Sequence, residues 1–181
     1  MKPVAVALNT MHNNHWLHLD IKSENILIDD EGLAVLGDLG ISQHYDESGK
    51  KITKGGGVGT QGRCSHLQYD MEYTKQFHPE LDIFSFAALM YYAMTGNDMR
   101  HFSPNDLDAP FIEISAKSKK ALRKALDQNL ETTPKSVREF MHMLPGCEKM
   151  VFEDIQPVDI DLSLTEEDLE PNNFEDLPYF T

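Results

Sequence analysis

The chain has 181 residues, of which 40% are hydrophobic, and it carries 30 acidic against 16 basic residues. This length suits a single domain with a buried core, while the net charge of -14 argues against nucleic acid as a partner. The longest apolar stretch, residues 84–94, is too short to cross a bilayer, so we expect no membrane association.

Apolar periodicity and turn residues predict a mainly helical chain with one β-hairpin. The segment VAVALNTMH supplies an apolar helix face, and AKSKKALRKALDQ is a basic amphipathic pattern whose leucines share one face. Gly96 is expected to end the central helix, and prolines 104 and 134 to open two later helices. In chain order the predicted elements are a helix at 4–13, hairpin strands at 26–29 and 33–36, a stretch of mostly loop at 41–79, and helices at 82–95, 104–109, 116–128 and from Thr133 to about Met143.

Four polar residues around the predicted hairpin have the spacing that phosphoryl transfer needs. Asp20, Lys22 and Asn25 precede its first strand, and Asp38 follows its second. Because the reaction requires a held magnesium ion and an aimed hydroxyl group, Asn25 and Asp38 are candidate oxygen ligands for Mg²⁺. Asp20 would accept or orient the hydroxyl proton, and Lys22 would neutralise charge on the moving phosphoryl group.

These residues resemble motifs of the eukaryotic-like protein kinase family. Residues 18–25, HLDIKSEN, resemble its H-R-D-x-x-x-x-N catalytic loop, and residues 38–40, DLG, resemble its D-F-G motif. Residues 58–68, VGTQGRCSHLQ, are similar to the VGTPGYMSPEQ end of a bacterial kinase activation segment, and ELDIFSFAALMYYAMTG is similar to the helix that follows. The resemblance covers roughly residues 3–146 and implies ATP and Mg²⁺ as cofactors and a protein as substrate.

The resemblance also implies a substrate class. Lys22 is typical of serine/threonine kinases, which usually keep a lysine two residues after the catalytic aspartate. In such kinases the threonine of the GT pair, here Thr60, bridges that aspartate and that lysine. The ordinary structural alternative is that the Thr60 hydroxyl only stabilises a turn. The implied catalytic set is Asp20, Lys22 and Thr60, with Asn25 and Asp38 holding Mg²⁺ and ATP.

A complete kinase of this family has an N-terminal lobe as well. That lobe carries a glycine-rich loop, a strand lysine and a helix glutamate, and none of these can be fitted to the residues before His12. We therefore expect a mainly α fold corresponding to the C-terminal lobe only, a helical bundle with a small β-hairpin at the catalytic site. The N-terminal lobe would be lost by truncation or supplied by upstream sequence or another chain.

Three departures from the family pattern bear on activity. Leu19 replaces the arginine of the catalytic loop, so no cationic pocket beside Asp20 would recognise a phosphorylated activation segment. Leu67 replaces a glutamate and Thr133 an arginine, and these two family residues normally pair. Their joint loss avoids leaving one buried charge without its partner.

Charge divides the chain into two regions. Residues 1–146 form the kinase-like part, whereas residues 147–181 hold eleven acids against one lysine and are expected to be a flexible, solvated tail. An alternative is that the apolar residues Phe174, Leu177, Tyr179 and Phe180 fold back over surface that the missing lobe would have covered.

Three other patterns have ordinary structural explanations. His12, His15 and His18 recur every third residue, but the chain should leave its helix before the last of them, so a metal site is not favoured. The glycines at 55–57 are followed by no G-K-[ST] sequence and predict a flexible loop rather than a phosphate cradle. The basic run 117–124 predicts a solvated helix face rather than a site for the acidic tail.

Cysteine usage and the first residues favour a cytoplasmic protein. Cys64 and Cys147 lie far apart and show no paired spacing, so neither a disulfide nor a zinc site is indicated. The opening residues MKPVAVALNTMHNNHW contain no small-residue cleavage site. We therefore expect a reducing, cytoplasmic environment.

Two functional hypotheses follow. In the first, the chain is a serine/threonine protein kinase domain that transfers phosphoryl groups from ATP to a protein hydroxyl and is weak or inactive without an N-terminal lobe. In the second, it is a pseudokinase module that binds a partner protein without turnover.

Overall fold

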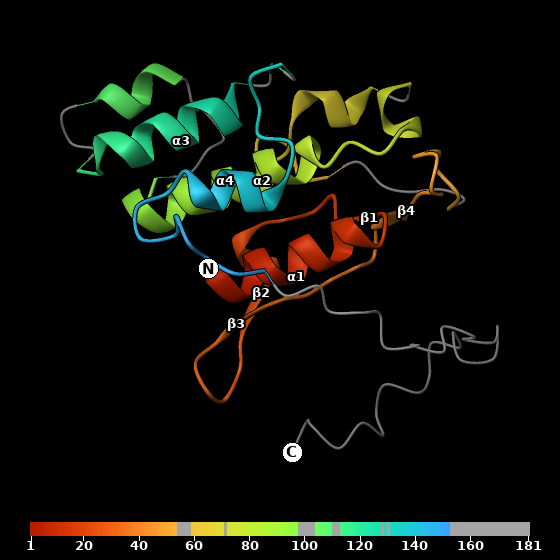
Figure 1. The fold of residues 1–181 in the computed structure, drawn as a ribbon, viewed down its shortest axis with the longest axis horizontal. Coiled ribbons are helices and arrows are strands. Elements are labelled where there is room, and N and C mark those ends of the chain that lie inside the picture. The colour runs from red at the N-terminus through yellow and green to blue at the C-terminus, as the bar shows by residue number, and fades with distance from the viewer. Residues whose placement is uncertain are drawn as a thin grey trace.

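The computed structural model describes residues 1–53, 59–70, 72–97, 104–109, 113–127, 129 and 131–152. The fold is mostly helical, as the sequence predicts, and it has two small antiparallel sheets, one of which is the predicted hairpin (Figure 1). With η for 3₁₀ helices, the elements are α1 (Lys2–Asn13), β1 (Trp16–Leu17), η1 (Ser23–Asn25), β2 (Ile26–Ile28), β3 (Ala34–Leu36), β4 (Gln43–His44), η2 (His66–Tyr69), η3 (Tyr73–Lys75), α2 (Glu80–Thr95), η5 (Pro104–Asp108), α3 (Ala116–Leu126) and α4 (Val137–His142).

Helix α2 lies at the centre of the core. Every residue from Leu81 to Tyr91 is buried, as expected for a helix that is apolar on nearly all sides. Helix α3 packs against α2, and α1 packs against α4 and β3. Helix α2 ends at Gly96, which adopts a left-handed conformation with φ 72°. Glycine takes this conformation at little cost, and the predicted end of the helix is confirmed.

Strands β2 and β3 form the predicted hairpin. Ile28 pairs with Ala34 at its closed end, and the Asp29 carboxylate accepts hydrogen bonds from the backbone N–H groups of Glu31 and Leu33 in the turn. The hairpin nevertheless presents much apolar surface to solvent. Its exposed large apolar side chains are Leu27, Ile28, Leu33 and Val35.

A second strand pair was not predicted. Leu17 of β1 pairs with Gln43 of β4. Strand β4 lies inside the stretch 41–79, which was predicted to be mostly loop. The buried Tyr45 hydroxyl donates to Gln43 Oε1 and lies 3.0 Å from the Thr74 carbonyl oxygen, so it holds β4 against η3. Burial raises the pKa of Tyr45 to about 12, and the hydroxyl stays protonated at neutral pH.

The predicted start of the last helix was wrong. Helix α4 begins at Val137, because the Ser136 side chain caps it by accepting a hydrogen bond from the Glu139 N–H group. Thr133 lies in the preceding turn, where its hydroxyl donates to the Asn129 carbonyl. No helix of the described part is long and apolar enough to cross a membrane.

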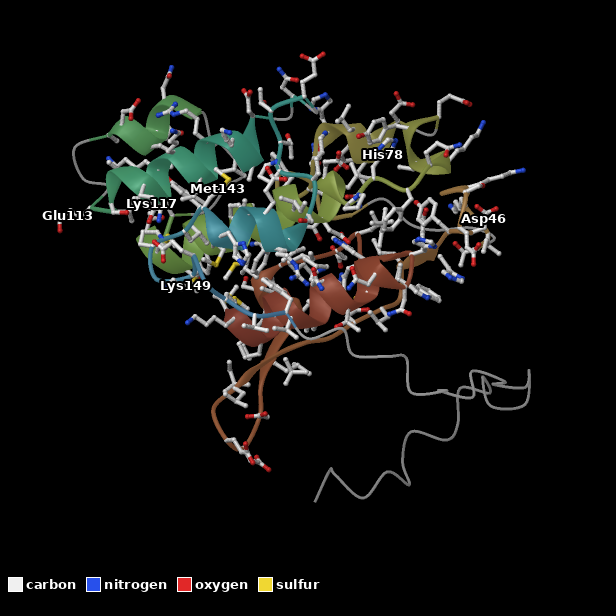
Figure 2. All side chains as sticks on the ribbon, in the orientation of Figure 1. Asp46, His78, Glu113, Lys117, Met143 and Lys149 are labelled. Atoms are coloured by element: carbon white, nitrogen blue, oxygen red, sulfur yellow. The ribbon has the colours of Figure 1, made fainter. Side chains whose placement is uncertain are left out.

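Residues 147–152 pack against the helices. Phe152 is buried, and the Arg138 guanidinium lies 5.3 Å from the centre of its ring. Lys117, labelled on α3 in Figure 2, forms an ion pair with Glu148, so this basic helix face contacts the first acidic residue of the C-terminal region. The apolar tail residues 174–180 and the glycines at 55–57 lie outside the described residues.

Candidate active site

The loop that carries Asp20 is anchored from below by Asp82 of α2. The fully buried Asp82 carboxylate accepts the backbone N–H groups of His18 and Leu19, each at 2.7 Å, and lies 2.9 Å from His12 Nε2. Burial raises the pKa of Asp82, but the hydrogen bonds from His12 and the two amides outweigh it and leave the pKa below its usual value. Asp82 is therefore a buried anion that fixes the start of the loop.

The His18 ring joins this loop to the strand that leads to Asp38. Its Nδ1 atom accepts the Asp20 backbone N–H at 3.3 Å, and its Nε2 atom lies 3.0 Å from the Gly37 carbonyl oxygen. A backbone N–H can only donate, so Nδ1 is unprotonated and Nε2 carries the proton. Because the completely buried His18 ring contacts both Asp20 and Gly37, it fixes the catalytic loop relative to the strand that leads to Asp38.

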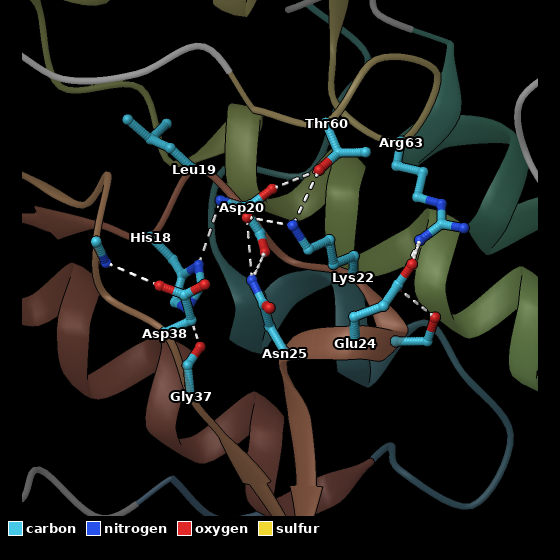
Figure 3. A network of polar contacts seen from close by, with 12 residues as sticks. His18, Leu19, Asp20, Lys22, Glu24, Asn25, Gly37, Asp38, Thr60 and Arg63 are labelled. Atoms are coloured by element: carbon cyan, nitrogen blue, oxygen red, sulfur yellow. Dashed lines mark hydrogen bonds and ion pairs between the residues drawn. The ribbon is translucent and has the colours of Figure 1, made fainter. Parts of the chain in front are cut away.

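Asp20 is the centre of a network that includes three of the other predicted residues (Figure 3). Lys22 Nζ lies 2.6 Å from Asp20 Oδ2, and the Thr60 hydroxyl donates to Asp20 Oδ1 at 2.8 Å. Thr60 also accepts from Lys22 at 3.2 Å, so it lies between the two residues. Asn25 Nδ2 donates to both the side chain and the backbone oxygen of Asp20.

These contacts determine the charge state of Asp20. Partial burial raises the pKa of Asp20, but the hydrogen bonds from Lys22 and Thr60 and the charge of Lys22 together lower it by more. The net pKa is below the usual value, so the carboxylate is ionised at neutral pH. An ionised carboxylate with a neighbouring ammonium group can orient a hydroxyl group and take up its proton.

Asp38 follows Gly37, whose carbonyl oxygen lies 3.0 Å from His18 Nε2, and Figure 3 draws no contact between Asp38 and Asp20. Asp38 adopts a left-handed conformation with φ 62°, its side chain accepts the Gly40 N–H at 3.1 Å, and the residue is exposed. Asn25 uses its amide nitrogen for Asp20, so its oxygen is the atom suited to a cation. One amide oxygen and one accessible carboxylate are hard donors that fit Mg²⁺ when phosphate and water complete the shell.

No group of three or more His, Cys, Asp or Glu side chains that could hold a metal occurs among the described residues. The three N-terminal histidines illustrate this, because the ring of His12 binds Asp82 while the ring of His18 binds Gly37. Their regular spacing therefore reflects separate structural contacts for these two side chains.

Three contacts between the catalytic loop and residues 59–68 were not predicted from the sequence. Gln68 Nε2 donates to the Leu19 carbonyl at 2.6 Å, and a Cβ added at Gly59 would come within 2.4 Å of that same oxygen. Gly59 therefore permits a close approach of two backbones, although the glycine-rich sequence around it suggested only flexibility. Arg63 also binds Glu24, and this hydrogen bond, with one from Ser23, lowers the pKa of Glu24 to about 2.

Leu67 and Thr133, which differ from the family pattern, face the same small pocket. Its lining residues are Ser65, Leu67, Glu80, Leu81, Phe84, Ala125 and Thr133. Residues that are 66 positions apart in sequence thus meet where the family pattern would place a glutamate and an arginine. The two departures from the family pattern therefore lie at one location.

Comparison with known proteins gives the same family throughout. The family described as protein kinase domain matches residues 1–151. Serine/threonine-protein kinase A of Trypanosoma brucei brucei is 31% identical over 91 residues, which cover 50% of this chain and 20% of that protein. Receptor-like protein kinase 5 of Arabidopsis thaliana is 30% identical over 64% of this chain and 11% of its own length. Ankyrin repeat and protein kinase domain-containing protein 1 of Mus musculus is 25% identical over 79% of this chain and 19% of its own length. The chain therefore spans a fifth or less of these relatives.

Proposed function

The chain belongs to the protein kinase domain family, and from this premise we propose that it is the C-terminal catalytic lobe of a serine/threonine protein kinase. The observation that carries the proposal is the network in which Lys22, Thr60 and Asn25 all contact the ionised Asp20 carboxylate. Four polar side chains held this closely, with Asp20, Lys22 and Thr60 partly exposed and Asn25 buried, suit a site that must receive a hydroxyl group. A purely structural role would not require Lys22 and Thr60 to converge on one carboxylate.

Each residue has a distinct proposed role. Asp20 orients the acceptor hydroxyl and takes its proton, while Lys22 balances negative charge that develops beside it. Thr60 keeps Asp20 and Lys22 in register through its two hydrogen bonds. The Asn25 amide oxygen and the Asp38 carboxylate would hold Mg²⁺, which supplies charge neutralisation for the phosphates of ATP when bound.

The proposed site is one half of a nucleotide-binding cleft. Residues 1–146 would supply the metal ligands and the base, residues 147–181 would be a C-terminal extension, and a nucleotide-gripping lobe would come from upstream sequence or from another polypeptide. Without that lobe we expect very slow turnover, because a displacement of about 1 Å can reduce a rate about 100-fold. The expected substrate is a protein, in a cytoplasmic setting.

A pseudokinase that only binds a partner protein is the second candidate. Its supporting observations are the small pocket shared by Leu67 and Thr133 and the exposed apolar side chains of the hairpin and of Leu39. Large exposed apolar patches commonly mark binding surfaces. This candidate predicts that the fold survives while nucleotide binding does not.

Thermal unfolding with and without Mg²⁺ and ATP separates the two candidates. Binding to the folded state alone stabilises a protein by about 1.4 kcal/mol at a ligand concentration of about ten times Kd, so the kinase hypothesis predicts a rise in Tm that requires both additions. Asp38→Ala should abolish this rise, whereas Glu113→Ala, an exposed acid at the edge of the molecule in Figure 2, should not. No rise at millimolar ATP in the wild-type chain would favour the pseudokinase.

A further inference from the structure

An open pocket lies directly beside Lys22. It is formed by the catalytic loop, by Arg63 and by the side of α2 that faces them. The lining residues are Ile21, Lys22, Ser23, Arg63, Ser85, Ala88, Leu89 and Tyr92. Figure 3 shows Lys22 and Arg63 on the same side of Asp20, opposite to Asp38, so the pocket lies on the side of Asp20 away from Asp38.

The chemistry of this pocket is uneven. Its inner wall is made by the buried side chains of Ile21, Ala88 and Leu89. The buried Ser85 hydroxyl donates to the Leu81 carbonyl at 3.3 Å, so its proton is already used within α2. The inner wall therefore favours an apolar group over a polar one, because burying a polar group without hydrogen bonds is costly.

The charged groups of the pocket have one sign. Lys22 and Arg63 belong to its lining, whereas their carboxylate partners Asp20 and Glu24 do not. A cationic side chain entering the pocket would find no carboxylate in its lining, because the nearby Asp20 and Glu24 already pair with Lys22 and Arg63. An anionic side chain would be attracted to the rim but would lose its hydration against the inner wall.

We propose that this pocket receives an aliphatic side chain of the protein substrate, located close in sequence to the acceptor hydroxyl. This specificity rests on the proposed function, since it takes Asp20 as the residue that meets the acceptor. Lys22 Nζ lies 2.6 Å from Asp20 Oδ2, so a single side chain separates the pocket from the acceptor position. An extended peptide advances about 3.3 Å per residue, which puts a residue two or three positions from the acceptor over the pocket.

Peptide binding tests this assignment without any need for catalysis. Fluorescein-labelled peptides with one central serine would carry leucine, alanine, lysine or glutamate at positions two or three residues to either side. Fluorescence anisotropy with the purified chain would give their relative affinities. Burying a leucine side chain contributes roughly 1.5 kcal/mol, or about tenfold in affinity, so leucine at one of these positions should bind about tenfold more tightly than alanine, with lysine the weakest.

Variants locate the preference. Ala88→Leu adds a side chain to the inner wall and should remove the leucine preference, whereas Met94→Ala, on an exposed side of the same helix, should retain it. If Ala88→Leu fails to fold, Ser23→Phe blocks the rim from an exposed position and should have the same effect. Equal affinities for all peptides, no detectable binding, or a leucine preference that survives in a folded blocked variant would each overturn the proposal.

The two proposals fail in different ways. Leucine selectivity without stabilisation by Mg²⁺ and ATP would leave the pocket assignment intact as a peptide-binding site and would refute phosphoryl transfer. Stabilisation by Mg²⁺ and ATP with no leucine selectivity would refute the pocket assignment alone.

Discussion

Arg63 Nη1 lies 2.5 Å from both carboxylate oxygens of Glu24. The contact joins the segment that follows Thr60 to the loop that carries Asp20, across 39 positions of sequence. It therefore adds a second connection between these segments, beside the hydrogen bond from Thr60 to Asp20. Being largely exposed, the ion pair gives orientation more than stability.

Glu24→Gln should make a small difference to stability that depends on pH. Because the folded-state pKa of Glu24 is about 2 and its ordinary value is 4.5, the ion pair contributes above pH 4.5 and its contribution is lost as the pH falls toward 2. Exposure limits the loss at pH 7 to below about 1 kcal/mol. Urea unfolding of both proteins at pH 7 and pH 3 measures this, and an equal difference at both values would contradict it.

Asp82→Asn should destabilise the protein strongly. The asparagine NH₂ group would either face a backbone N–H donor of His18 or Leu19 or replace the oxygen that contacts His12. At least one hydrogen bond would then be lost, and hydrogen bonds to charged groups contribute about 1.5–3 kcal/mol each. We expect a loss of about 3 kcal/mol or more in the free energy of unfolding at pH 7, measured with urea. Glu113→Gln, an exposed acid, is the control and should change it by less than about 0.5 kcal/mol. A similarly small effect of Asp82→Asn would show that the loop does not depend on this carboxylate.

Gly59→Ala should displace the segment that carries Thr60. The added Cβ would lie 2.4 Å from the Leu19 carbonyl oxygen and 2.5 Å from Gln68 Nε2, so the hydrogen bond between those groups must lengthen or break. We expect a loss of about 1–3 kcal/mol in stability. Gly32→Asn is a suitable control, because asparagine tolerates its positive φ and nothing lies within 4 Å of the added Cβ. Equal Tm values for the two variants would contradict the close approach.

Leu67→Glu and Thr133→Arg should each destabilise the protein and partly rescue one another. The single change Leu67→Glu puts a carboxylate into a pocket that Leu81, Phe84 and the acid Glu80 also line. Unpaired buried charges cost about 3–5 kcal/mol. The double variant should recover at least about 1 kcal/mol relative to the sum of the single losses. Purely additive losses in a double-mutant cycle would show that no ion pair can form there.

Local sequence signals were sufficient for most of the helical framework. The apolar pattern before Asn14, the hairpin at residues 26–36 and the αL glycine at position 96 are short-range features, and the structure has all three. The start of α4 was also encoded locally, because Ser136 and Glu139 have the spacing of a helix start. Pro134 predicts an earlier start, but Ser136 supplies the capping hydrogen bond that a proline side chain cannot make.

Contacts between distant segments could not be read from local patterns. Strand β1 has two residues and pairs with β4, also of two residues, so neither shows a periodic pattern of its own. The pair of Arg63 and Glu24 likewise depends on how two loops meet. The spacing of Asp20 and Asn25 was informative because both lie in one short loop, whereas the contact of the His18 ring with Gly37, the residue before Asp38, depends on how two separate segments meet.

The bare apolar hairpin also affects how long the chain would persist in a cell. Leu27 and Ile28 are 58% and 67% exposed, and chaperones and proteases recognise such surface in incompletely folded polypeptides. A polypeptide that covers β2 and β3 would hide this surface and lengthen the lifetime of the chain. Cellular abundance should then follow the supply of that companion, even where the free energy of unfolding of the chain itself is unchanged.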